Sequence, residues 1–141
     1  MSDLFAAQHH GTRTQLATQA CQRALQYAGV SGTEVDTIAV IRLFSDAAKI
    51  WACPFGGSNN PPESIARQIG ATPQRRIYSS VGGTEPLTLM VELLQAIAHG
   101  AIKVALLTGV EAIATQRFAT RKCYVLNWTE EFDVPLDKRE F

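Results

Sequence analysis

The chain has 141 residues, of which 46% are hydrophobic and 18% charged, a composition typical of one globular domain. Its 13 Lys and Arg residues equal its 13 Asp and Glu residues, so no net charge attracts nucleic acid or an anionic membrane. The start lacks the apolar core of a signal peptide, no run reaches transmembrane length, and the three cysteines have no CxxC spacing. We therefore expect a cytoplasmic protein with no membrane or nucleic-acid partner, no metal site and no resident cofactor.

The first segment, residues 1–11, is predicted to be a polar arm, and its adjacent His9 and His10 are typical of a solvated pair rather than a metal site. A helix should follow, beginning at a cap on Thr12 or Thr14 and ending near Ala28. Its apolar side contains Cys21, where a free cysteine behaves as a small buried hydrophobic residue.

A buried parallel strand is predicted over residues 37–44, because TIAVIRLF is apolar and β-branched. Arg42 interrupts it, and a charge at the carboxyl end of a strand points either to solvent or to a ligand. The long loop over residues 45–60 is of a kind that is commonly functional or forms an interface. Cys53 lies in this loop without a nearby histidine or cationic helix start, which favours an idle thiol and leaves a reactive one as the alternative.

The central stretch, residues 76–115, has the order strand, glycine turn, helix and strand, which predicts a βαβ unit and an α/β fold. It follows a helix that Asn60 should cap and that starts at two prolines. The strand over residues 77–81 ends at Gly82 and Gly83, and Thr84 is the expected N-cap of the next helix. One broad apolar face of that helix is predicted to be buried, and its members are Leu87, Met90, Val91, Leu94, Ile97 and Ala98.

The glycine turn allows two interpretations. The glycines could serve only to reverse the chain, or Gly82, Gly83 and Thr84 could form an anion site where the strand edge meets the positive end of a helix. A nucleotide-binding Rossmann module is disfavoured, because SVGGTEP does not match GxGxxG. After the strand over residues 104–107 we expect a short helical or irregular segment, a strand over residues 124–128, and a polar C-terminal tail over residues 131–141.

Several of these segments together resemble the first half of a thiolase-superfamily subunit. The likeness rests on the GG turn, the helix ending in His99-Gly100, the strand over residues 104–107 and the following TGVEA. IRLF, CPFGGSNNPP and the later Ile-Gly-Ala are similar to a branch described as acetyl-CoA acetyltransferase-like, near the sterol-carrier-protein type. The resemblance covers about residues 12–130. It implies an incomplete three-layer half with a βαβαβ-type mixed sheet around a buried helix.

The chain departs from the family pattern at the nucleophile. Thiolases hold their acyl group on a cysteine at the start of this helix, and that position falls at Gly83, or at Gly82 after a one-residue slip. Ser79 and Ser80 are near but need a base, and His99 lies about 20 Å away along the helix. The family's second half, with its catalytic histidine, has no counterpart here, so we predict no catalytic residue in this chain.

Three functions follow from the resemblance. The first is a non-catalytic, thiolase-like scaffold that acts as a homodimer, paired through Ile77, Tyr78, Ser79 and Ser80, or with a partner chain carrying the second half. The second adds CoA or acyl-CoA as a ligand at Gly82, Gly83 and Thr84. The alternative is an acetyl-CoA acetyltransferase completed by a partner chain, with catalysis on Cys53 or on the partner.

Overall fold

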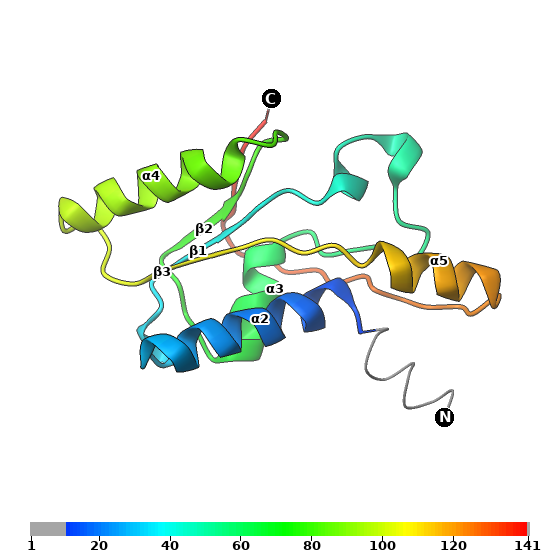
Figure 1. Cartoon of the computed structure of the whole chain (residues 1–141), viewed down its shortest axis with the longest axis horizontal. Coiled ribbons are helices and arrows are strands. Elements are labelled where there is room, and N and C mark those ends of the chain that lie inside the picture. Colours follow the sequence, from blue (N-terminus) through cyan, green and yellow to red (C-terminus); the bar gives the residue numbers. More distant parts are fainter. Residues whose placement is uncertain (1–10, 141) are drawn as a thin grey trace.

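The computed structural model describes residues 11–140 and has an α/β fold, in agreement with the prediction. Four strands form one sheet in the order β3-β1-β2-β4, and every neighbouring pair runs parallel. Helices cover both faces, α2 and α3 on one and α4 on the other (Figure 1). The mixed sheet that the resemblance implied is therefore wrong for the described strands. These are β1 (Thr37–Val40), β2 (Arg75–Tyr78), β3 (Ala105–Thr108) and β4 (Asp137–Lys138).

Helix α2 (Arg13–Ala28) begins as its sequence predicts. The Thr12 hydroxyl accepts a hydrogen bond from Gln15 N at 3.1 Å, and Thr12 N donates to Gln15 Oε1 at 2.9 Å. This reciprocal pair is a capping box, which satisfies two backbone N–H groups that the helix itself cannot. The first helical turn is therefore fixed by local sequence. His9, His10 and the arm over residues 1–10 lie outside the described residues.

Helix α3 (Pro61–Ile69) is also set by its first residues. The Asn60 side chain accepts a hydrogen bond from Glu63 N at 3.2 Å, and the two prolines occupy the first turn, where a missing N–H is harmless. The predicted cap and start are confirmed.

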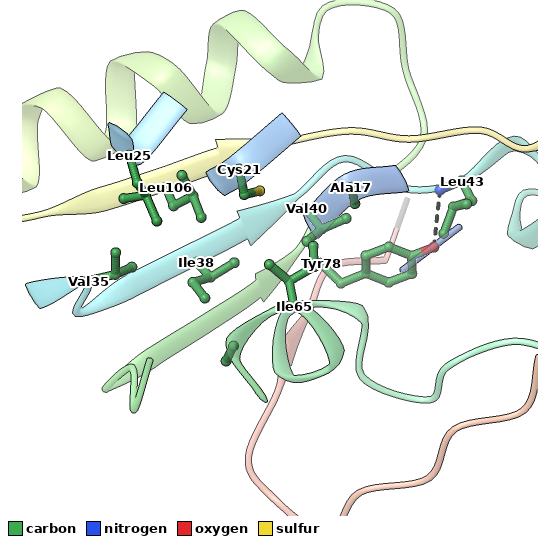
Figure 2. Close-up of a cluster of buried hydrophobic side chains, with 11 residues drawn as sticks. Ala17, Cys21, Leu25, Val35, Ile38, Val40, Leu43, Ile65, Tyr78 and Leu106 are labelled. Atoms are coloured by element: carbon green, nitrogen blue, oxygen red, sulfur yellow. Dashed lines mark hydrogen bonds between the residues drawn. The ribbon is translucent and has the colours of Figure 1, made fainter. Parts of the chain in front are cut away.

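The main core lies between the sheet and the pair α2 and α3. Figure 2 shows these side chains pointing toward one another from strands and helices. Cys21 is among them, as predicted for a free cysteine on the apolar side of α2. The cluster consists of Ala17, Cys21, Leu25, Val35, Ile38, Val40, Leu43, Ile65, Ala66, Tyr78 and Leu106.

Helix α4 (Glu85–Ala98) packs on the opposite face of the sheet with a different side from the one predicted. Leu89 and Leu93, one turn apart, are buried against Ala39, Ile77 and Ile102. The apolar side chains that the sequence predicted to be buried are exposed. Helix α4 carries apolar residues on nearly every side. Among the described residues, the sheet covers the side that contains Leu89 and Leu93. The exposed set is Leu87, Met90, Val91, Leu94 and Ile97.

The C-terminal segment agrees with its prediction only in part. Helix α5 (Ile113–Arg121) forms where a short helical or irregular segment was expected. Residues 124–128 form no strand, whereas β4 pairs with β2 through Ile77 and Tyr78. The described part of the predicted polar tail, residues 131–140, contributes the short and exposed strand β4 to the sheet. No helix in residues 11–140 is both long and apolar enough to cross a membrane.

Candidate functional site

The carboxyl ends of β1, β2 and β3 meet at one edge of the sheet, which is where open parallel sheets bind their ligands. Arg42 follows β1, Ser79 follows β2 and Glu111 follows β3. The turn from Gly82 to Thr84, which we call the GG turn, leads from this edge into α4. This edge and the start of α4 are the candidate site.

The GG turn is exposed, and its two glycines differ in what they would tolerate. Gly82 has a φ of 157°, which residues with a side chain rarely adopt, whereas a Cβ at Gly83 would meet no atom within 4 Å. Glu85 N donates to Gly82 O at 3.2 Å, which closes the turn. Within residues 11–140, the N–H groups of Gly83 and Thr84 donate to no protein acceptor. The turn thus presents free donors at the positive end of α4.

Thr84 occupies the predicted N-cap position but does not cap the helix with its side chain. Its backbone is already helical, with φ −91° and ψ −10°, whereas a capping side chain needs an extended backbone. Its carbonyl instead accepts bonds from Leu87 N and Thr88 N, both at 3.1 Å. The Thr84 hydroxyl is consequently not needed to hold the helix.

Arg42 joins the ends of β1 and β2 to the C-terminal segment. Its Nε donates to Ser79 O at 2.8 Å, and a terminal nitrogen donates to Arg139 O at 2.5 Å. Arg42 N also donates to the Ser79 hydroxyl at 2.8 Å, and that hydroxyl donates to Ser80 O at 2.8 Å. The interruption of the predicted strand by Arg42 therefore has a structural role, and the buried Ser79 hydroxyl is fully engaged.

Tyr78 forms a second polar group beneath this edge. Its hydroxyl donates to Asp46 Oδ2 at 2.5 Å and accepts from Leu43 N at 3.0 Å, the bond drawn in Figure 2. Burial, followed by the hydrogen bond to Asp46, raises the pKa of Tyr78 well above its ordinary value. Tyr78 therefore stays protonated and fixes the loop after β1 to the end of β2.

The predicted dimer strand is not accessible in this structure. Ile77, Tyr78 and Ser79 are buried, and Ser80 is half-buried. β1 pairs with one edge of β2 and β4 with the other, so no edge of β2 is open at Ile77 and Tyr78. Direct pairing with a second copy at these residues would require β4 to move away.

No described cysteine is paired with a base. Cys53 is half-buried in the loop after β1, Cys123 is exposed, and burial raises the pKa of Cys21 despite a hydrogen bond with Thr108. His99, at the far end of α4, places Nδ1 2.7 Å from Gln95 O. Among the described residues there is also no group of three side chains able to hold a metal ion. No described cysteine therefore has the partner base that activates a thiol nucleophile.

An ion-pair cluster attaches α4 to the C-terminal segment. Arg139 contacts the Glu92 carboxylate at 2.5 and 2.7 Å, and Arg75 approaches it at 3.1 Å. Hydrogen bonding to Arg139 lowers the pKa of Glu92 to about 2, against the opposing effect of burial. Asp137 of β4 also contacts Arg139, at 3.2 Å. These contacts hold β4 beside β2 and fix the orientation of α4.

The exposed side of α4 borders the GG turn. We call it the α4 apolar face, and its side chains are between 39% and 66% exposed. The spacing is helical, so they form one continuous stripe along the helix. The stripe consists of Leu87, Met90, Val91, Leu94 and Ile97.

Sequence reasoning found the GG turn and noted Arg42, but missed Asp46 and Arg139. Asp46 meets Tyr78 across 32 positions of the chain, and Arg139 meets Arg42 across 97. Pairs so far apart leave no local pattern. No protein-family model, no curated protein and no solved structure matches the chain.

Proposed function

We propose that the chain is a thiolase-like scaffold that acts by association and supplies no nucleophile of its own. The observation that supports this proposal most directly is the α4 apolar face. Soluble domains rarely expose contiguous apolar patches larger than a few hundred Å², and such patches mark interaction surfaces. A helix that is apolar on nearly every side is typical of a buried helix, so α4 is suited to a layer between two bodies.

The resemblance to thiolases provides a candidate for what covers the α4 apolar face. It aligns Gly83 with the missing cysteine and α4 with a helix that is buried in the family. In this proposal the α4 apolar face is the surface that a second unit covers. That unit is a second copy when no other partner is present, or a partner chain carrying the second thiolase half.

Light scattering at micromolar concentration tests the proposal. We expect the unmodified chain to have a mass above that of the monomer. The double variant Leu87→Glu, Leu94→Glu should be monomeric, because it places two charges in the stripe. Tyr27→Glu is the matched control, since Tyr27 is 98% exposed on α2, on the other side of the sheet. A monomeric unmodified chain at tens of micromolar would contradict self-association through this face.

A second candidate is acyl transfer completed by a partner chain. The open space at Gly83 and the free N–H groups of the GG turn favour an anionic or acyl ligand there. Calorimetric titration with CoA and acetyl-CoA tests binding at Gly82, Gly83 and Thr84, and mass spectrometry tests acylation of Cys53. No heat at millimolar ligand, with an unmodified Cys53 in the presence of the partner, would refute this candidate.

A further inference from the structure

A groove on the surface of α5 lies apart from the GG turn. It consists of two hollows, of about 280 Å³ and about 530 Å³. Gln116 and Arg117 line both hollows, so the two adjoin at these residues. We call this feature the α5 groove. Both hollows are open to solvent, and together they are large enough for a small molecule to lie along them.

One end of the α5 groove, the smaller hollow, carries four large apolar side chains. Phe44 and Trp51, from the loop after β1, stack with ring centroids 4.2 Å apart and an angle of 24° between the planes. They are 51% and 46% exposed. Ile50, which is 84% exposed, and Ile113 of α5 complete the wall. An apolar ligand that covered these side chains would remove their surface from water, which favours binding.

The other end of the groove is cationic. Arg117 and Arg121 are one helical turn apart and line the larger hollow with Gln116 and Thr120. Both arginines are exposed, and within residues 11–140 neither guanidinium group forms an ion pair or hydrogen bond. The carboxyl end of a helix carries about half a negative charge, which two guanidinium groups outweigh. This end is therefore suited to an anion.

The acidic residue nearest to the groove does not oppose an anion at that end. Glu111 lines the apolar hollow and not the larger one. Its carboxylate accepts a hydrogen bond from Phe44 N at 2.5 Å, which holds it at the base of the loop. The large apolar side chains thus line the smaller hollow, Arg121 lines the larger one, and Arg117 lies between them and lines both.

We infer that the α5 groove binds an amphipathic carboxylate, with an aliphatic chain on the apolar end and its carboxylate on Arg117 and Arg121. The two ends are a suitable distance apart, because α5 rises about 12 Å from Ile113 to Arg121 at about 1.5 Å per residue. A medium-chain fatty acid spans this distance. The inference is independent of the proposed association through α4.

Titration with decanoate, followed by tryptophan fluorescence, tests the inference. The chain has two tryptophans, and Trp128 is buried, so a response on binding should come from Trp51 and be absent in Trp51→Phe. Decan-1-ol has the same chain without the charge, and should bind on the order of tenfold more weakly, because it forms no charge-assisted bonds.

The variant Arg117→Gln, Arg121→Gln should weaken decanoate binding by about tenfold or more and leave decan-1-ol binding unchanged. Arg23→Gln, at an exposed position on α2, is the matched control and should bind decanoate normally. Circular dichroism establishes that each variant is folded. The inference is overturned by equal affinity for the acid and the alcohol, by full affinity in the double variant, or by no Trp51 response at millimolar decanoate. It is also overturned if decanoate acts by dissociating a dimer, because the groove would then be an interface.

Discussion

The side of α4 that packs on the sheet can be established by a matched pair of truncations. Leu89 is 0% exposed and packs with Leu93, Ala39 and Ile77, whereas Leu94 is 58% exposed. Leu89→Ala removes buried methyl groups and leaves a cavity, so it should lower the free energy of unfolding by about 2–5 kcal/mol. Leu94→Ala, at low protein concentration, should change it by less than about 0.5 kcal/mol. Leucine and alanine have similar helix propensities, so packing accounts for the difference.

Urea denaturation of both variants, followed by circular dichroism, measures these changes. The melting temperature of Leu89→Ala should fall by roughly 6–15 °C, at about 3 °C per kcal/mol for a domain of this size. Each experiment is run at submicromolar concentration, where self-association through the α4 apolar face does not contribute. If Leu94→Ala proves the more damaging change in the monomer, the α4 face predicted from sequence is the buried one and the packing described above is wrong.

Three further predictions concern the GG turn, the ion pairs and a helix cap. Gly83→Cys, with Cys53 and Cys123 replaced by Ser, should give a thiol with a lowered pKa that reacts rapidly with a disulfide reagent at neutral pH; an ordinary rate would place the family's cysteine elsewhere. The pKa of Glu92 is depressed in the folded chain, so the contribution of its ion pairs to stability is present above about pH 4.5 and is lost as the pH falls toward 2. Glu92→Gln should therefore flatten the pH dependence of the free energy of unfolding in that window. An unchanged acid profile would show that these ion pairs do not stabilise the fold. Thr12→Ala should lower the free energy of unfolding by about 1 kcal/mol in urea, and no loss would mean that the capping box does not stabilise α2.

The elements that were predicted well are those whose ends are determined within a few residues. The Thr12 cap pairs with Gln15, and the Asn60 cap pairs with Glu63, both three positions away. A capping side chain must lie this close to its helix, so the pattern is visible in the sequence. The starts of α2 and α3 could therefore be predicted without knowledge of the fold.

The buried side of α4 could not be predicted in this way. Apolar residues occur nearly all round the helix, so periodicity does not distinguish Leu89 and Leu93 from Leu87 and Leu94. The choice between the sides depends on which one faces Ala39 and Ile77, residues in two different strands. The buried side of α4 is therefore set by tertiary contacts, which the sequence of the helix does not reveal.

The same distinction between local patterns and long-range contacts applies to the candidate site. The GG turn was visible because glycines before a helix form a local pattern, and the space at Gly83 agrees with a position that could accept a side chain. The C-terminal strand was missed because its two residues, Asp137 and Lys138, are polar and have no strand periodicity. Arg139, anchored to Glu92 and Tyr78, fixes the segment through long-range contacts.

The position of β4 bears on how two copies could associate. Pairing through β2 would require loss of the bonds that Arg139 makes to Tyr78 O and to Glu92, each contributing on the order of 1 kcal/mol or more. Covering the α4 apolar face requires no such loss. In the proposed association, contact through α4 with β4 in place is therefore favoured over pairing through β2.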